Sequence, residues 1–382
     1  MVRPEPGRPR AAAGARIRPD SGRDAMSRRA LITGAAGQDG WYLARLLLER
    51  GYEVHGHARS AAQAEAGSPI VWHYGDIGDV AEVSRLLALV GPDEIYNLAS
   101  FSRPRDAIEQ PVASSVVNAL GPLHIFDFAR QHLPACRIFQ PSSSEIFGAV
   151  ESPVQDENTA RRPASPYGIA KLFAHEMAAF YRKRFGLFVA CGILFNHESP
   201  RRPLQYVSQK IAHAAAAVSL GLLTTAELDE VGRPIVSNGK LRLGNLDVRR
   251  DFGFAGDYAE AMWLALQADA ADDYVIGTGQ SYSIRDFCEM AFAHVGKDWR
   301  AHVEVDPALL RPIDSLVTVA QPAKAAQVLG WRPRTPFKTL VAMLVDARVY
   351  ALSRGTGRAS HSPWANPTTC SVAPLAGDLT SL

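Results

Sequence analysis

The feature that most constrains this chain is a glycine-rich segment at residues 33–40, TGAAGQDG, between a predicted strand and a predicted amphipathic helix. Gly34, Gly37 and Gly40 are spaced three residues apart. Glycine lets the backbone turn sharply and approach a phosphate, while free amides and the dipole at a helix start stabilise its charge. With a strand before it and a helix after it, the segment predicts the pyrophosphate site of a nicotinamide dinucleotide; a turn that binds nothing is the alternative.

Apolar, β-branched runs alternate with helical patterns from residue 29 to about 195, which is typical of parallel βαβ units. Strands are expected at 30–33, 53–57, 70–74, 94–98, 137–140 and 188–193. Beyond residue 195 we expect loops, an alanine-rich helix at 209–219 and short strands that include 241–244 and 274–276. The predicted fold class is α/β: a Rossmann-type doubly wound parallel sheet with a smaller C-terminal α/β substrate-binding cap over the strand ends.

The predicted domain organisation has four parts, and the 47% hydrophobic content is ample for a sizeable core. Residues 1–27 are expected to be a disordered leader, or an artefact of a start that belongs at Met26. Residues 28–195 form the dinucleotide-binding domain, and 196–350 form mainly the cap, with some return to the sheet. Residues 351–382 are expected to be a disordered tail.

The charge balance and the cysteine positions limit the kinds of binding partner that the chain is expected to have. With 41 basic and 39 acidic residues, the chain gives no reason to expect a nucleic-acid or membrane partner, so small-molecule chemistry is favoured. Its four cysteines, Cys136, Cys191, Cys288 and Cys370, show no C-x-x-C or Cys/His ligand spacing. We therefore expect no metal site and free thiols in the cytoplasm.

The residues after the second strand indicate which dinucleotide is bound. Arg59 and Ser60 stand where an acidic residue would hold an unphosphorylated ribose, which favours NADP over NAD; a solvated loop charge is the alternative. Asp76 follows the third strand, where a carboxylate can meet the adenine amino group. Besides the glycines and Arg59, the predicted cofactor contacts are Gln38, Asp39, Asp76, Ile77, Leu98, Ser100 and Ser102.

Two segments carry candidate catalytic groups. Tyr167 and Lys171 are four residues apart, which places both on one helical face, where the ammonium can lower the phenol's pKa and hold the cofactor ribose. Tyr167 would then act as a base toward a substrate hydroxyl. After the fifth strand, residues 141–148 (PSSSEIFG) bring hydroxyls and the carboxylate of Glu145 to the strand ends. Glu145 is suited to removing a proton from the carbon next to a carbonyl. The alternative interpretations are that Tyr167 only packs in the core and that Glu145 only caps a loop.

In these segments the chain resembles the extended short-chain dehydrogenase/reductases and, more narrowly, the GDP-mannose 4,6-dehydratase family. The resemblance covers roughly residues 29–345 and is strongest at 37–40 (GQDG), 142–145 (SSSE) and 193–202 (ILFNHESPRR). It continues through 243–247 (LGNLD), 250–251 (RD), 311–312 (RP), Lys324 and 329–331 (LGW). The run NHESPRR is long and specific, and we do not expect it in epimerases or simple reductases.

The resemblance implies that GDP-D-mannose is converted to GDP-4-keto-6-deoxy-D-mannose, with NADP as a cofactor that is not consumed. Tyr167 removes the proton of the sugar 4-hydroxyl, to which Ser143 donates a hydrogen bond, while C4 gives up hydride. Glu145 takes the C5 proton and delivers it to the departing C6 hydroxyl. Hydride then returns to C6, so oxidation at C4 and reduction at C6 cancel.

The resemblance also implies roles for residues after the fifth strand. His197 and Arg202 map to cofactor contacts, in addition to Tyr167 and Lys171. Residues that map to the GDP and sugar side, besides Ser143 and Glu145, are Asn196, Lys210, Arg250 and Arg311. Cations among them can bond a diphosphate.

Some positions depart from the family. Ser143 replaces a threonine, which keeps the hydroxyl, whereas Arg103 and Ala113 replace a histidine and a tyrosine on the nicotinamide side. The loop after Arg59 is shorter than the basic loop that reaches a neighbouring subunit in relatives, so a homodimer is favoured over a tetramer. Two rival functions remain: a nucleotide-sugar reductase or epimerase, for which Glu145 is superfluous, and a catalytically silent dinucleotide-binding regulator.

Overall fold

The computed structural model describes residues 27–63, 67–148, 152–310 and 317–355. Of the predictions above, those for residues 1–26, Arg311, Cys370 and residues 356–382 lie outside the described residues.

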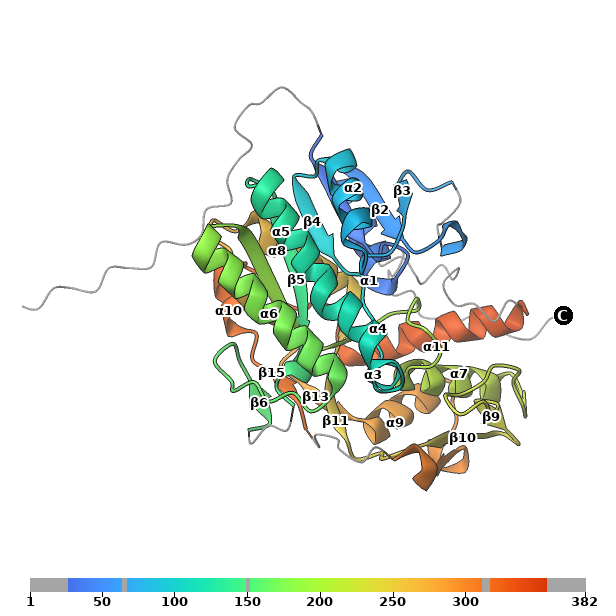
Figure 1. Cartoon of the computed structure of the whole chain (residues 1–382). Coiled ribbons are helices and arrows are strands. Elements are labelled where there is room, and N and C mark those ends of the chain that lie inside the picture. Colours follow the sequence, from blue (N-terminus) through green and yellow to red (C-terminus); the bar gives the residue numbers. More distant parts are fainter. Residues whose placement is uncertain (1–26, 64–66, 149–151, 311–316, 356–382) are drawn as a thin grey trace, which may run out of the picture.

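A sheet of seven parallel strands forms the centre of the molecule, in the order β12-β7-β5-β4-β1-β2-β3 (Figure 1). Its inner strands are covered on both faces, and Ala30, Leu31 and Ile32 are fully buried. The strands are β1 (Arg29–Thr33), β2 (Glu53–Ala58), β3 (Val71–Tyr74), β4 (Glu94–Asn97), β5 (Arg137–Ser143), β7 (Phe188–Leu194) and β12 (Asp273–Ile276). This is the strand order of a Rossmann fold with one strand added, so the predicted fold class is confirmed.

Two layers of helices cover the sheet. One layer contains α1 (Gln38–Glu49) and α8 (Ala255–Gln267), and the other contains α2 (Val80–Val90), α5 (Gly121–His132) and α6 (Pro166–Phe185). Local signals set their ends: the Asp79 side chain accepts the amides of Ala81 and Glu82 at the start of α2, and Ser165 accepts the amide of Gly168 in α6. α2 and α6 each end at a left-handed glycine.

The helical segment Pro111–His132 is long and apolar enough to cross a membrane by length and composition alone. It contains α4 (Pro111–Ser115), a π-helical turn η2 (Val116–Leu120) and α5. However, its most apolar window is 44% buried, and it packs against α2 and α6.

The second part of the molecule lies beside the carboxyl ends of the strands and contains helices and small sheets (Figure 1). Its helices α7 (Val207–Ser219), α9 (Ile284–His294) and α11 (Phe337–Ser353) pack against one another. Its strands are β8 (Asn196–Glu198), β9 (Val236–Ser237), β10 (Lys240–Leu243), β11 (Arg249–Phe254), β13 (Ser281–Ser283) and β14 (Val303–Val305). The remaining elements are β6 (Val154–Gln155), β15 (Val319–Ala320), α3 (Pro104–Glu109), α10 (Ala323–Val328), η1 (Ala61–Gln63), η3 (Ser144–Ile146), η4 (Trp299–Ala301) and η5 (Pro307–Leu309).

The chain returns to the central sheet after building much of the second part. β12 pairs in parallel with β7, so the sheet has seven strands where the alternation before residue 195 indicated six. α8, which precedes β12, packs beside α1. α11 extends to Ser353, so residues 351–353 are helical where a tail was expected.

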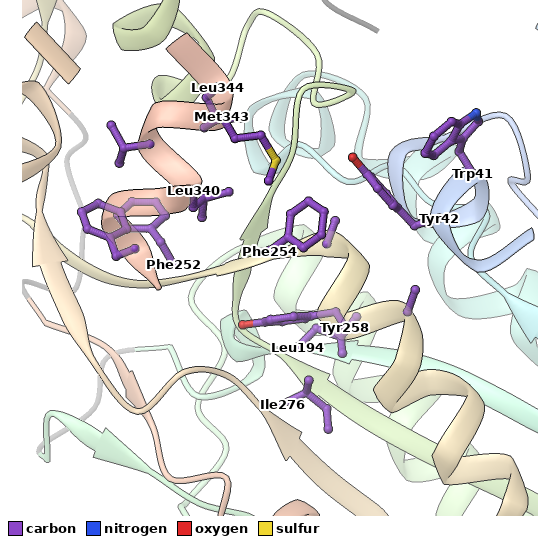
Figure 2. Packing of buried hydrophobic residues seen from close by; sticks show 14 of the residues in the cluster. Trp41, Tyr42, Leu194, Phe252, Phe254, Tyr258, Ile276, Leu340, Met343 and Leu344 are labelled. Atoms are coloured by element: carbon purple, nitrogen blue, oxygen red, sulfur yellow. The ribbon is translucent and has the colours of Figure 1, made fainter. Parts of the chain in front are cut away.

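One apolar core joins the two parts (Figure 2). Tyr42 of α1 meets Phe254 of β11 edge to face, with ring centroids 5.2 Å apart. On the other side, Phe252 stacks on Phe337 at the start of α11, and Leu340 and Leu344 continue that contact surface. Because the parts share a core, the loops at the strand ends are held at a defined position against β8 and α7.

Candidate active site

The glycine-rich turn lies at the carboxyl end of β1 and begins α1. Gly34 has a φ of +68°, and a Cβ there would lie 2.8 Å from the backbone nitrogen of Ala99. A Cβ on Gly40 would lie 2.6 Å from the Cα of Ala35. Glycine is therefore required both for the left-handed turn and for close packing of helix on strand. These constraints fit the predicted role of the segment as a phosphate-binding turn.

A ladder of buried polar side chains supports this turn and was not predicted from the sequence. Thr33 Oγ1 donates to Asn97 Oδ1 at 2.8 Å, and Asn97 Nδ2 donates to Gln140 Oε1 at 2.8 Å. The Ala99 amide donates to Thr33 Oγ1 at 3.1 Å. The ladder ties the ends of β1, β4 and β5 together, because each buried polar group needs a partner.

The predicted cofactor residues after β4 are anchored by another residue that sequence patterns did not reveal. Ser100 Oγ donates to Oδ1 of the buried Asn118 at 2.8 Å, and the same oxygen accepts the Phe101 amide. Ser102 Oγ lies 2.9 Å from the Tyr206 hydroxyl at the start of α7. This loop is thus held from both parts of the molecule.

The start of α1 is joined to β8 by a network of polar contacts. His197 Nε2 lies 3.0 Å from Asp39 Oδ2, and His197 Nδ1 donates to the Phe195 carbonyl at 2.7 Å. Gln38 donates to the His197 carbonyl and accepts a hydrogen bond from Ser199 at 2.8 Å. The GQDG and NHESPRR segments, both prominent in the sequence, are therefore in direct contact.

This network perturbs the protonation of its two charged members. Burial opposes charge on Asp39, but the charge and hydrogen bond of His197 overcome it and lower the pKa of Asp39 to about 2. Burial likewise opposes charge on His197, and Asp39 overcomes it, so the pKa of His197 is raised. A carbonyl and an ionised carboxylate both accept hydrogen bonds, so the surroundings of His197 favour a proton on each ring nitrogen.

Ser143, Tyr167 and Lys171 come together where β5 meets the start of α6. Tyr167 and Lys171 are buried on one face of α6, and Lys171 Nζ donates to the Pro141 carbonyl at 3.2 Å. Ser143 Oγ accepts the Glu145 amide at 3.2 Å and hydrogen-bonds the Tyr167 phenol. The serine proton is thereby available to the phenol oxygen.

The pKa values of this group correct one prediction. Burial raises the pKa of Tyr167 well above its usual range, and the Ser143 hydrogen bond offsets only part of this. The expected lowering by Lys171 is not found, because the Lys171 ammonium is bonded to a carbonyl and lies 5.8 Å from the ring centroid. Burial lowers the pKa of Lys171 to about 8, so this cation titrates near neutral pH.

Glu145 lies in η3, directly after Ser143, and its side chain is exposed. A Cβ on Gly168 would lie 2.6 Å from the Glu145 carbonyl, so η3 is closely packed on the start of α6. The Glu145 charge contributes to the raised pKa of Tyr167, which places the two groups within electrostatic range. The Glu145 charge therefore acts on the tyrosine, from a short loop that directly follows Ser143.

Arg202 is a second cation, besides Lys171, in the surroundings of Tyr167. Its guanidinium lies 3.7 Å from the Tyr206 ring centroid, and its Nε lies 3.5 Å from Glu198 Oε2. That nitrogen is buried and has no hydrogen-bond partner among the described residues, and the same is true of Ser142 Oγ. Unsatisfied buried polar atoms in these two segments fit a site that receives a polar ligand.

The residues that were predicted to contact the nucleotide sugar have different surroundings in the structure. Asn196 begins β8 next to the His197 network, and Arg250 of β11 donates to the Arg249 carbonyl at 2.8 Å. Lys210 is buried in α7, and its ammonium bonds both oxygens of Glu230 at 2.8 and 2.7 Å. Its charge is therefore already paired with a carboxylate, which sequence reasoning did not foresee. Arg311 lies outside the described residues.

Arg59, Asp76 and Ile77 follow the outer strands β2 and β3. The Arg59 side chain is exposed and has no ion-pair partner among the described residues. Asp76 is also exposed, and its carboxylate accepts the Gly78 amide at 2.8 Å. Ile77 is buried beneath it. These residues lie on the β2–β3 side of the glycine turn, in the order expected for an adenosine moiety.

The fold, the glycine turn and the Ser143, Tyr167 and Lys171 group define the class of extended short-chain dehydrogenase/reductases. Residues 31–344 match the family model described as GDP-mannose 4,6 dehydratase. The chain belongs to the GDP-mannose 4,6-dehydratase family.

Individual relatives agree with this assignment. GDP-mannose 4,6 dehydratase 1 of Arabidopsis thaliana is 39% identical over 335 residues, which is 83% of this chain and 88% of that protein. The human GDP-mannose 4,6 dehydratase is 37% identical over 84% of this chain and 91% of its own length. A solved UDP-glucose 4-epimerase from Thermus thermophilus, in complex with NAD, superposes with a TM-score of 0.70 at 27% identity, covering 83% of this chain and 98% of that one.

Proposed function

We propose that this protein is an NADP-dependent GDP-mannose 4,6-dehydratase that converts GDP-D-mannose to GDP-4-keto-6-deoxy-D-mannose. The observation that carries the proposal is the position of Glu145. Its carboxylate lies within electrostatic range of Tyr167, next to a serine that hydrogen-bonds the same phenol. A dehydrogenase or epimerase needs the hydroxyl and the phenol, whereas loss of water across C5 and C6 also needs a group that moves a proton at C5.

A bound nicotinamide dinucleotide would supply the hydride chemistry, taking hydride from C4 and returning it to C6. The chain's own residues would supply the proton transfers. Tyr167 removes the proton of the 4-hydroxyl, and Ser143 donates a hydrogen bond to that oxygen as negative charge develops. Glu145 takes the C5 proton, which the 4-ketone has acidified, and returns it to the departing C6 hydroxyl as water. The carboxylate thus ends the elimination ionised, as it began. When hydride adds to C6, a proton returns to C5, and this proton balances the one that Tyr167 took from the 4-hydroxyl.

The raised pKa of Tyr167 has a consequence for the first step. A buried phenol is a poor source of phenolate by itself, so a cation must approach it when the site is assembled. Arg202 and Lys171 are the cations on this side of the site. We assign Lys171 to the nicotinamide ribose and Arg202, with His197, to the remaining cofactor contacts.

NADP is proposed rather than NAD because of Arg59. The side chain directly follows β2, is exposed and pairs with no carboxylate among the described residues, so its guanidinium is available for a 2′-phosphate. The Thermus thermophilus relative was solved with NAD, so the fold alone does not select NADP, and the proposal rests on the local residue Arg59.

The decisive experiment is to incubate the purified protein with GDP-mannose and a catalytic amount of NADP+. We expect a product lighter by one water, a ketone detectable by reaction with a hydrazine, and no net NADPH absorbance. Net oxidation of NADPH in the presence of a keto sugar, without water loss, would instead establish a reductase. A change of sugar stereochemistry without mass change would establish an epimerase, and dinucleotide binding without turnover of any nucleotide sugar would favour the silent regulator.

We further propose that the protein forms a homodimer through the exposed face of α6. Ile169, Phe173 and Phe180 on this helix are 57%, 40% and 49% exposed, which is unusual for large apolar side chains on one element. Sedimentation of the purified protein measures its mass directly. Phe180→Glu should release monomers, whereas a tetramer in the unmodified protein would require a second interface.

We also propose a cytoplasmic location. Cys136, Cys191 and Cys288 are buried free thiols, which suits a reducing compartment. Fractionation of cells that express the tagged protein tests this, and recovery in an oxidising compartment would contradict it.

A further inference from the structure

A second cluster of reactive side chains lies away from the proposed active site. His175 of α6, Cys191 of β7 and Asp273 of β12 bring a ring nitrogen, a thiol and a carboxylate oxygen within 4.8 Å of one another. His175 and Cys191 are fully buried, and the Asp273 side chain is 15% exposed. Nothing in the proposed dehydration uses these three residues.

The histidine of this cluster is unsatisfied. Neither ring nitrogen of His175 has a hydrogen-bond partner within the part of the chain that the structure describes, although the side chain is fully buried. Its Nε2 lies 3.4 Å from Asp273 Oδ2, which is long for a hydrogen bond. Buried polar atoms in native proteins almost always have a partner, so such an atom calls for an additional bonded group.

The carboxylate of Asp273 offers its two oxygens to different partners. Oδ1 accepts a hydrogen bond from Arg182 Nη2 at 2.9 Å, and the same guanidinium donates to the Val189 carbonyl. Oδ2 faces His175. Arg182 therefore orients the carboxylate from behind, as carboxylates that hold metal ions are usually oriented by hydrogen bonds to their outer oxygen.

We propose that His175, Cys191 and Asp273 bind a thiophilic divalent cation, with zinc as the natural choice. Nitrogen, sulfur and oxygen donors from one histidine, one cysteine and one aspartate are ligands that zinc takes in tetrahedral sites. Such a set could not be recognised from sequence spacing, because Asp273 of β12 lies far along the chain from His175 and Cys191 of the consecutive elements α6 and β7.

The charges around the cluster are compatible with a bound cation. A metal-bound cysteine is a thiolate, so thiolate and carboxylate together balance the ion. The cationic neighbours are Arg182 and Arg161, of which the first is bonded to Asp273 and the second to Glu176. Both guanidinium groups are thus already paired with carboxylates.

The position of the cluster suggests what the ion would do. His175 lies four residues after Lys171 and eight after Tyr167 on α6, so all three share one buried face of that helix. A metal ion would attach this face to β7 and β12 of the central sheet. It would thereby act as a structural clamp on the helix that carries the tyrosine and the lysine, and it would not touch substrate.

The test uses the full-length protein freed of metal with a chelator and then titrated with Co²⁺, whose thiolate complexes absorb in the near ultraviolet. We expect a thiolate-to-cobalt band that saturates at one equivalent and that zinc displaces. The band should be lost in Cys191→Ala and weakened in His175→Gln. Cys288→Ala is the matched control, because Cys288 is equally buried but belongs to no such cluster among the described residues.

A second measurement does not depend on variants that fold poorly. One equivalent of Zn²⁺ should raise the thermal midpoint of the metal-free parent protein and of Cys288→Ala, but not that of Cys191→Ala. The proposal is overturned if the parent protein shows no cobalt band, or if Cys191→Ala binds cobalt with the same band and stoichiometry as the parent. Because both readouts are independent of turnover, failure of the dehydratase assay would leave this result intact.

Discussion

Nε2 of His197 lies 3.0 Å from Oδ2 of Asp39, although the two residues are 158 positions apart in the chain. Asp39 lies within the glycine-rich segment, in the first turn of α1, and His197 belongs to β8. The pair therefore couples the start of α1 to the strand that leads into the second part of the molecule. The His197 ring also stacks on Tyr258 at a centroid distance of 4.7 Å, which fixes its plane.

Replacing His197 with glutamine should destabilise the protein in a pH-dependent manner. The pKa of His197 is raised above 6.5, so its contribution is complete below pH 6.5 and is lost as the pH rises through the raised value. The pKa of Asp39 is lowered from 3.8 to about 2, so its contribution is complete above pH 3.8 and is lost as the pH falls toward 2. The pair is therefore most stabilising between these limits, by about 2 kcal/mol.

Urea unfolding of the parent protein and His197→Gln at pH 5 and pH 9 measures this difference. The gap in unfolding free energy should be larger at pH 5. His294→Gln is the control, because His294 pairs with Asp346 at the surface, where an ion pair contributes at most about 1 kcal/mol. A gap for His197→Gln that is the same at both pH values would show that the pair is not ionic.

Replacing Gly34 with alanine should abolish dinucleotide binding. Its φ of +68° costs an alanine about 1–2 kcal/mol, and the new Cβ would also press on the Ala99 backbone at 2.8 Å. Gly51→Ala is a matched control, because Gly51 has a φ of +78° and no atom within 4 Å of the added Cβ. Binding is measured by quenching of tryptophan fluorescence. Equal affinities in the two variants would disprove the importance of the close approach at Gly34.

Glu145→Gln should separate oxidation from elimination. Glutamine keeps the size and polarity of the side chain but cannot take a proton, so the C4 oxidation should survive while water loss slows by about 10²–10⁴-fold. In a single turnover with GDP-mannose, reduced cofactor should then accumulate. Tyr167→Phe should stop both steps and accumulate nothing. Normal turnover by Glu145→Gln would remove the carboxylate from the proposed mechanism.

Arg59→Glu should reverse the preference for NADP. A carboxylate repels a 2′-phosphate and can accept hydrogen bonds from an unphosphorylated ribose, so the affinity for NADPH should fall at least about tenfold, or about 1.4 kcal/mol, while NADH binding is kept or improved. Arg85→Glu changes the same charge on the exposed face of α2 and should leave the ratio of the two affinities unaltered. If both variants lower the NADPH affinity equally, the effect comes from the overall charge of the protein and not from a contact between Arg59 and the 2′-phosphate.

Several features were predictable from the sequence because they depend on neighbouring residues. The turn at Gly34 follows from local backbone geometry, and the shared face of Tyr167 and Lys171 follows from the helical period. The six strands of the central sheet up to β7 were predicted to within a few residues, since buried parallel strands produce continuous apolar runs, whereas the short β6 outside this sheet was not predicted. The family resemblance was confirmed by the comparisons, because long motifs such as NHESPRR carry more information than any single residue.

Other features were decided only by the folded chain, because they depend on what burial brings together. Tyr274 lies in a short strand that could belong to either part, and pairing with β7 places it in the central sheet. Lys210 has the sequence context of a diphosphate ligand, but Glu230 reaches its ammonium only through the fold. The pKa of Tyr167 was expected to fall because a lysine is four residues away; burial raises it instead.

The sequence by itself thus determined the phosphate-binding turn, the Tyr167 and Lys171 pair and the family, all of which rest on local geometry or contiguous motifs. The tertiary structure decided the pKa shifts of Tyr167 and Lys171 and the side chains that contact them and the turn. It joined Asp39 to His197 and Thr33 to Asn97, and it gathered His175, Cys191 and Asp273 from three segments. The physical reason is that a buried polar group takes its pKa and its hydrogen bonds from whatever the fold places beside it.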